Sequence, residues 1–269
     1  MFNVGFDTGA GTRQVQISSM MLWNVRLVLT KRRIDNLLVG KGLVESRAKA
    51  QALVMAGKVV VEGRAVTKAG MLVAEEASIT IIKPPPFVGR GGFKLDYALD
   101  CFDIDVSNRV VADVGASTGG FTDCVLQRGA KRVYAIDVGR GQLDYRLRQD
   151  SRVVVLDRVN ARYPINLPGK IDLATIDVSF ISVKRVIPSV ARLFGDNGYL
   201  LVLIKPQFEA KREEVSKGGV VKQPVVHARV LGRFIAWMIE HGFRLGGLVA
   251  SPILGASGNK EFFVLLKLK

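Results

Sequence analysis

The chain has 269 residues, a length that fits one large domain or two modest ones. Its hydrophobic content of 48% and charged content of 23% are typical of a soluble globular protein, and no apolar run approaches the ~18 residues of a membrane span. The net charge of +15 indicates a polyanionic partner or an anionic membrane surface. The two cysteines and two histidines lack metal-ligand spacing, so we expect no zinc cluster and no metal.

Residues 1–30 show no clear periodicity, and we expect a disordered leader there. An alternative is upstream sequence before a start at Met20 or Met21. Polar residues interrupt its apolar stretch and no small-residue cleavage site is evident, which argues against a secretory signal. We therefore expect Cys101 and Cys124 to be reduced and buried, in a cytoplasmic protein.

Residues 31–82 predict a small α+β domain. Ile34, Leu37 and Leu38 share one helical face, and a second helix is expected from Glu45 to Ala56, where a glycine stops it. Short strands at 59–61 and 65–66 then form a hairpin around a Glu-Gly turn. Between residues 31 and 90 there are 11 basic and five acidic residues, so this part of the chain is strongly basic.

Three ordered motifs lie in this stretch: R-x-D-x-L-L from Arg33, S-R-x-x-A from Ser46 and A-G-x-V-x-V-x-G from Ala56. They resemble the small RNA-binding domain named after a protein of the small ribosomal subunit. The resemblance implies that its basic faces hold RNA phosphates, contacts that position a protein without reading sequence. The candidate RNA contacts are Arg33, Arg47, Lys49 and Arg64. A charge run alone would equally fit a solvated surface.

The stretch KPPPFVGRGG, from Lys83 to Gly92, is the predicted boundary between two domains. Its three prolines give a stiff extended spacer and its glycines a flexible end. We therefore expect a linker over 83–92 and a second domain over 93–269.

The second domain alternates helical stretches with short apolar runs. Helices are expected at 93–102, 186–194 and 225–241, and strands at 110–114, 132–136, 153–156, 171–176, 199–204, 245–251 and 262–267. Apolar strands that alternate with helices predict an α/β fold, a Rossmann-like parallel sheet covered on both faces. Ligands bind such sheets at the carboxyl ends of the strands.

A glycine-rich turn, VVADVGASTGGFTD, follows the first of these strands. Its order from Gly115 to Gly120 is G-x-x-x-G-G, which matches neither the dinucleotide fingerprint nor the P-loop. Asp113 and Asp123 flank the turn, where they would repel a pyrophosphate but suit a cation. Asp137 comes 22 residues after Gly115, about where doubly wound folds place a carboxylate on ribose hydroxyls.

S-adenosylmethionine is a cation that carries a ribose and no phosphate, so it is the candidate ligand of this turn. Two polar residues after the third strand of the domain, Asp157 and Asn160, could bond an adenine or ribose edge. The candidate contacts are Asp113, Gly115, Ala116, Ser117, Thr118, Gly119, Gly120, Asp137, Asp157 and Asn160. The alternative is a glycine-rich turn with ordinary helix caps.

Two lysines and two carboxylates occur where they could meet at the carboxyl edge of the sheet. Lys94 lies in RGGFKL, Asp177 in DVSFIS, Lys205 in IKPQFE and Glu261 in GNKEFF. A lysine so placed can accept a proton from a hydroxyl group. Two structural ion pairs are the alternative interpretation.

From Lys31 to Lys269 the chain resembles the TlyA or hemolysin A family, whose second domain is an FtsJ-like ribose 2′-O-methyltransferase. The matching motifs are RGGFKL, DVGASTGGFTD, IDVGRGQLD, DVSFIS, IKPQFE, KGGVV and GNKEFF, in this order. The resemblance implies a catalytic tetrad of Lys94, Asp177, Lys205 and Glu261, S-adenosylmethionine as cofactor, and ribosomal RNA or ribosomal subunits as partner. Gly89 departs from the family, in which a serine is expected before the arginine.

Three rival functions remain to be weighed. The hemolysin name suggests a membrane-active cytolysin, against which the lack of a signal or membrane span argues. The methyltransferase fold could be inactive and serve only to bind RNA, but all four tetrad residues are present. A dinucleotide-dependent oxidoreductase is disfavoured because the glycine spacing is wrong.

Overall fold

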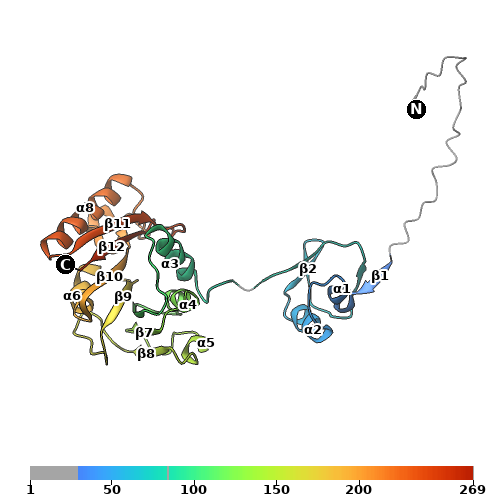
Figure 1. Cartoon of the computed structure of the whole chain (residues 1–269). Coiled ribbons are helices and arrows are strands. Elements are labelled where there is room, and N and C mark those ends of the chain that lie inside the picture. The colour runs from blue at the N-terminus through green and yellow to red at the C-terminus, as the bar shows by residue number, and fades with distance from the viewer. Residues whose placement is uncertain (1–29, 84, 269) are drawn as a thin grey trace, which may run out of the picture. The chain divides into compact units, whose positions relative to one another are not determined.

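The computed structural model describes residues 30–83 and 85–268, which fall into two compact units, Met1–Pro84 and Pro85–Lys269 (Figure 1). The leader predicted over residues 1–30 therefore lies, except for Thr30, outside the described residues. Within the described part of the chain, no helix has both the length and the apolar character needed to cross a bilayer.

The first unit packs two helices on short strands. Its elements are β1 (Lys31–Arg33), α1 (Ile34–Gly40), α2 (Arg47–Met55), β2 (Val59–Val61), β3 (Arg64–Val66), β4 (Leu72–Ala74) and β5 (Ile79–Ile81). β1 pairs with β4, and β2 lies between β3 and β5, all antiparallel. Ile34, Leu37 and Leu38 are buried at its core, as their helical spacing predicts.

The second unit is built on a seven-stranded sheet. Its elements are α3 (Arg90–Cys101), β6 (Val110–Val114), α4 (Gly120–Gln127), β7 (Arg132–Asp137), α5 (Tyr145–Arg148), β8 (Val153–Asp157), β9 (Ile171–Ile176), the 3₁₀ turn η1 (Val183–Arg185), α6 (Ile187–Ala191), β10 (Phe194–Ile204), α7 (Pro206–Glu209), the 3₁₀ turn η2 (Arg212–Glu214), α8 (Pro224–Glu240), β11 (Arg244–Ala250) and β12 (Phe262–Lys267).

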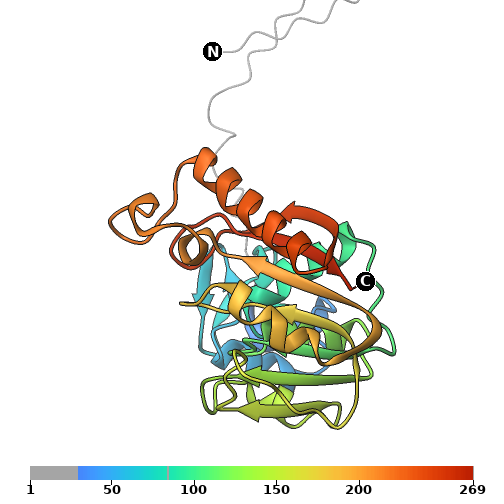
Figure 2. The same cartoon turned by 90° about the vertical axis from the view of Figure 1, so that its left-hand side faces the viewer.

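The strand order is β11-β12-β10-β9-β6-β7-β8, parallel from β10 to β8 and antiparallel at β11 and β12. Two hydrophobic clusters cover its faces, one containing Phe234 of α8 and Ile187 of α6, the other Leu95 of α3 and Phe121 of α4. Figure 1 shows these helix pairs on opposite sides of the strands, and Figure 2 shows α8 running along β11. The predicted α/β fold, a Rossmann-like sheet with a small α+β unit before it, is confirmed.

Some local expectations differ from the structure. Helix α3 begins at Arg90 rather than residue 93, and Phe87 of the predicted linker is buried, with its ring 5.3 Å from that of Phe93. Gly92 lies so close to Phe87 that a Cβ would stand 2.4 Å from the Cβ of that residue, so it serves packing rather than flexibility. Cys101 is exposed, contrary to expectation, whereas Cys124 is buried; neither is in a disulfide.

Candidate active site

The turn from Gly115 to Gly120 joins β6 to α4 at the carboxyl edge of the sheet. Gly115 has φ +87°, and a Cβ there would lie 2.3 Å from the carbonyl oxygen of Asp177. Gly119, at φ +97°, packs on the side chain of Leu147, and Gly120 faces the backbone of α3. The glycines therefore let Asp177, which follows β9, and the first residues of α3 lie close to the turn.

A cavity of about 1030 Å³ opens beside this turn. Of the predicted cofactor contacts, Gly115, Ser117, Asp137 and Asn160 line it. A smaller hollow of about 170 Å³ is lined by Ala116, Thr118 and Gly120, together with Gly91 and Phe121. The two hollows share Gly115, Ser117 and Asp177, so both lie against the turn.

Asp137, at the end of β7, is held in a fixed orientation at the cavity. Its Oδ2 accepts the backbone N–H of Ser117 at 2.8 Å, and its Oδ1 accepts that of Gly139 at 2.7 Å. A carboxylate oxygen can accept more than one hydrogen bond, so both oxygens can also receive hydroxyl groups from a ligand. This is the chemistry that a ribose diol requires.

Three of the predicted cofactor contacts do not line either hollow. Asp113 is fully buried and accepts hydrogen bonds from Thr122 Oγ1 at 2.7 Å and Thr175 Oγ1 at 3.1 Å. Asp157 pairs with Arg148 at 3.2 Å, and Gly119 packs on leucine side chains. These contacts give two of them structural roles: Asp113 ties β6 to α4 and β9 beneath the turn, and Asp157 fixes the segment after β7 by accepting the N–H of Gly141. The part of all three residues in cofactor binding stays a prediction.

The catalytic candidates form two ion pairs. Lys205 Nζ lies 2.7 Å from Asp177 Oδ1 and donates a hydrogen bond to Ser179 Oγ at 2.8 Å. Lys94 Nζ lies 2.5 Å from Glu261 Oε2, and both of these side chains are buried. The four side chains therefore form two ion pairs, as the alternative interpretation predicts. The strand register shows that these two pairs lie next to each other.

Strand register places these groups in a row along the edge. Ile204, the last residue of β10, pairs with Phe262 of β12, so Lys205 and Glu261 are the next residues on facing strands. Asp177 directly follows β9, which runs parallel to β10 on its other side. The order along the edge is therefore Glu261, Lys205, Asp177 and Gly115, with Lys94 reaching Glu261 from α3.

Asp177 presents its carboxylate to Lys205 at this edge. Its Oδ1 lies 2.7 Å from the ammonium of Lys205, which also donates a hydrogen bond to Ser179. Asp177 lines both hollows. The ion pair therefore holds the Lys205 ammonium at the edge of the sheet that the hollows adjoin.

Some residues around the cavity were not anticipated from the sequence. Phe180 has φ +63° and is 92% exposed, and its ring lies 5.1 Å from that of Phe208 in α7. Glu209 accepts hydrogen bonds from Ser182 Oγ and the backbone N–H of Val183, both at 2.7 Å. The motifs DVSFIS and IKPQFE contain these residues, but no spacing rule indicates that the two segments touch.

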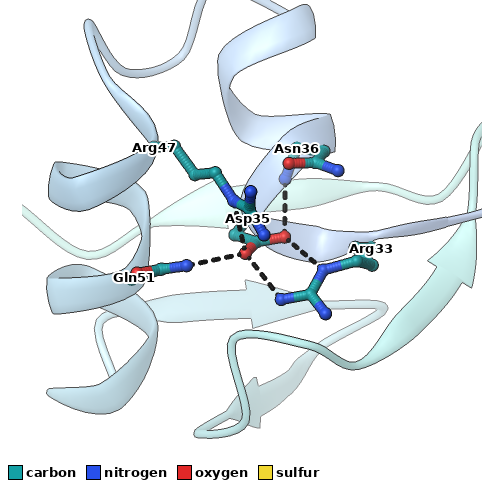
Figure 3. Close-up of polar contacts among 5 residues, drawn as sticks. All are labelled: Arg33, Asp35, Asn36, Arg47 and Gln51. Atoms are coloured by element: carbon teal, nitrogen blue, oxygen red, sulfur yellow. Dashed lines mark hydrogen bonds and ion pairs between the residues drawn. The ribbon is translucent and has the colours of Figure 1, made fainter.

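Three of the four RNA candidates of the first unit are engaged in ion pairs. Arg33 and Arg47 both contact Asp35 (Figure 3). Lys49 Nζ lies 3.0 Å from Glu45 Oε1, and Arg64 is exposed on β3. Their placement neither requires nor contradicts RNA contact, so their role stays a prediction.

Comparison with known proteins gives a consistent result. Residues 87–268 match the FtsJ-like methyltransferase family, and residues 32–79 match the S4 domain. The chain is 46% identical to a Bacillus subtilis protein named as an rRNA methyltransferase, YqxC, over 88% of this chain and 85% of that one. It is 42% identical to the 16S/23S rRNA (cytidine-2′-O)-methyltransferase TlyA of Mycobacterium tuberculosis, over 88% and 90%. A solved structure of a Streptococcus thermophilus protein that carries the name hemolysin is 41% identical, with a TM-score of 0.67 and 90% of each chain covered.

Proposed function

The chain belongs to the FtsJ-like methyltransferase family, in its TlyA or hemolysin A group, and from this premise we propose that it methylates a ribose 2′-hydroxyl of ribosomal RNA. It is an S-adenosylmethionine-dependent methyltransferase. The observation that carries the proposal is the Asp177–Lys205 ion pair, which lies at the sheet edge beside the glycine turn. A lysine held in this place can act on a hydroxyl group next to a bound methyl donor.

The residues of the cavity fit S-adenosylmethionine. Asp137 offers two oriented oxygens for the ribose diol, and Asn160 lies in the same cavity. The carboxylate of Asp177 lines both hollows and is a negatively charged group that suits a positively charged ligand. When bound, S-adenosylmethionine supplies an electrophilic methyl group whose bond to sulfur breaks as the ribose oxygen forms the new O–C bond.

We assign the four polar residues distinct roles in this transfer. In its neutral amine form Lys205 binds the 2′-hydroxyl group and takes its proton, becoming the ammonium that pairs with Asp177, while Asp177 and Ser179 fix the position of Nζ. The buried Lys94–Glu261 pair abuts Lys205 across the β10–β12 ladder and holds that edge rigid. Because these groups mainly orient the reacting oxygen, most of the rate enhancement they give comes from positioning.

The substrate is ribosomal RNA, free or in ribosomal subunits, and we place the reaction in the cytoplasm. The S4 domain over residues 32–79 and the net charge of +15 support an RNA partner. Two relatives whose sequences are 46% and 42% identical to this chain are named as rRNA methyltransferases. The target nucleotide has to leave its stack to reach the sheet edge, as in other enzymes that act on single nucleotides.

The test is incubation with labelled S-adenosylmethionine and separated ribosomal subunits that lack the modification, followed by mapping of the blocked ribose. We expect Lys205→Ala to abolish methyl transfer while S-adenosylmethionine affinity, measured by calorimetry, changes only about two- to fivefold, because the residue acts on the hydroxyl. Lys170→Ala is the matched control, since Lys170 precedes β9 at the opposite end from Asp177. Full activity in Lys205→Ala would remove this residue from the mechanism, and dye release from liposomes by the pure protein would favour the cytolysin.

A further inference from the structure

Asp35, in the first turn of α1, carries a carboxylate that is completely buried in the first unit. Five donors converge on it (Figure 3). Oδ1 accepts the backbone N–H of Asn36 at 2.9 Å and Nε of Arg33 at 3.1 Å. Oδ2 accepts Nη2 of Arg33 at 2.9 Å, Nε of Arg47 at 3.1 Å and Nε2 of Gln51 at 3.0 Å. The acceptor capacity of the carboxylate is thus fully used.

The two arginines lie on the surface although their shared partner is buried. Their side chains are 43% and 56% exposed, against 0% for Asp35. Arg33 donates to the carboxylate through Nε and Nη2, and Arg47 donates through Nε alone. The outer N–H groups of both guanidinium groups make no hydrogen bond to Asp35. Nη2 of Arg33 and Nε of Arg47 contact the same oxygen at 2.9 and 3.1 Å, so they cannot be more than 6.0 Å apart.

We propose that Asp35 is a positioning residue that holds Arg33 and Arg47 together as one binding site for a single backbone phosphate of RNA. The inference rests on the proposed function, since it specifies how the RNA is gripped. Asp35 itself does not touch the RNA. It fixes the planes of two guanidinium groups before the phosphate arrives.

The physical argument is one of charge and geometry. Two guanidinium groups this close repel each other, and a buried carboxylate between them removes that repulsion. A guanidinium binds phosphate through parallel N–H groups of a rigid fork, so fixing its plane reduces the entropy lost on binding. The hydrogen bond from Arg33, with those from Gln51 and Arg47, holds the pKa of Asp35 well below its usual range despite its burial. The charge that pairs the arginines is therefore present at neutral pH.

A purely structural role is the competing interpretation. Buried ion networks are weak evidence for stability, because well-packed apolar residues of similar volume often replace them without loss. The surroundings of Arg33 instead favour a shaped site. A Cβ on Gly70 would approach Nη1 of Arg33 to 3.3 Å, so the glycine leaves room for the guanidinium group. Asp35 donates its backbone N–H to the carbonyl oxygen of Ala69, which ties α1 to the same loop before β4.

The first experiment compares Asp35→Asn with Glu75→Gln in the full-length protein, by measuring the Kd for unmodified ribosomal subunits. Glu75 is the matched control, since it also pairs with an arginine of this unit, Arg32 at 3.0 Å, but on the surface. Each variant removes one negative charge, which by itself strengthens binding to RNA. We expect Asp35→Asn to weaken binding about tenfold instead, the size of one charge-assisted contact, and Glu75→Gln not to weaken it. Unchanged or tighter binding by a folded Asp35→Asn protein would overturn the proposal.

A second variant keeps the proposal testable if Asp35→Asn unfolds. Arg47→Lys preserves the charge but not the planar fork, so we expect it to lose about as much affinity as Arg47→Ala. An Arg47→Lys protein with the wild-type Kd would show that only charge matters and would overturn the proposal.

A mutant cycle separates positioning from structure. In an Arg33→Ala/Arg47→Ala background, Asp35→Asn has no arginine left to position, so we expect no further loss of RNA affinity. A further loss there would favour the structural interpretation. The wild-type protein separates a failure of the proposed function from a failure of the role of Asp35. If the wild type neither binds nor methylates ribosomal subunits, the proposed function fails. If the wild type is active and the Asp35→Asn variant binds equally tightly, only the role of Asp35 is overturned.

Discussion

Asp113 is a single carboxyl group whose ionisation the fold opposes. Burial, with a smaller contribution from the charge of Asp177, raises its pKa from the ordinary 3.8 to about 6, although the hydroxyls of Thr122 and Thr175 donate to it. The folded state therefore binds this proton more tightly than the unfolded chain. The stability that the protonated group confers is fully present below about pH 4 and is lost as pH rises through about 6.

This linkage predicts the effect of replacing Asp113 with asparagine, which resembles the protonated acid. The difference between the two pKa values corresponds to roughly 3 kcal/mol in full, of which about 1 kcal/mol falls between pH 5 and pH 8. We expect Asp113→Asn to gain stability relative to the wild type by about that amount between pH 5 and pH 8, in urea unfolding. The exposed Asp196→Asn variant serves as the control, and a stability difference that does not vary with pH would contradict the argument.

The sequence predicts that Asp137 lies at the cavity, which it lines, but could not separate it from Asp113. Both belong to apolar strands inside the sheet, β7 and β6, and both lie near the turn. The sheet is covered on both faces, so alternation along a strand does not tell which side chain faces the cavity. Only the packing of Thr122 and Thr175 on Asp113 shows that its carboxyl lies beneath the turn.

At the scale of elements, Glu209 joins the two segments that carry the Asp177–Lys205 pair. It ends α7, which starts directly after Lys205, and it binds Ser182 and Val183 of the segment that follows Asp177. Burial raises the pKa of Glu209, whereas its hydrogen bonds to Ser182 and Val183 oppose that shift. Glu209 is thus a candidate positioning residue, held at some cost in desolvation.

We predict that Glu209→Ala destabilises the protein by about 1–3 kcal/mol, because it leaves buried donors unpaired. It should also lower kcat for methyl transfer about tenfold or more through misplacement of Asp177 and Lys205, with little change in S-adenosylmethionine affinity. Single-turnover kinetics and calorimetry at a temperature where both proteins are folded measure this. Glu213→Ala, an exposed acid in η2, is the control. A destabilised variant with wild-type kcat would assign Glu209 to stability alone.

Element boundaries were harder to predict than element types. The helix that carries Lys94 starts at Arg90, where Phe87 is buried in the core and Gly92 packs on it. The prolines and glycines of this stretch predicted a linker instead. Strand β10 begins at Phe194, within residues expected to be helical, whereas α6 ends at Ala191. In both places tertiary packing overrides local propensity.

At the scale of the whole molecule, the rule that ligands bind at the carboxyl ends of strands predicts where Asp177 and Lys205 meet. It does not predict which lysine pairs with which carboxylate, because that depends on strand order and register. The antiparallel β12 brings Glu261 beside Lys205, yet α3 supplies Lys94 as its actual partner. Sequence reasoning therefore locates the group of four but leaves its internal pairing open.

The net charge of +15 gives a last prediction, on salt dependence. RNA binding releases counterions, so the logarithm of the affinity for ribosomal subunits should fall linearly with the logarithm of salt concentration, while S-adenosylmethionine affinity changes little. If Arg33 and Arg47 share one phosphate, Arg33→Ala/Arg47→Ala should reduce the slope by about one rather than two. Filter binding from 50 to 200 mM salt, a range over which six to ten phosphate contacts change affinity by about 10³–10⁵, gives the slopes. A flat wild-type dependence would mean that the positive charge does not serve RNA binding, and a loss of two would assign a separate phosphate to each arginine.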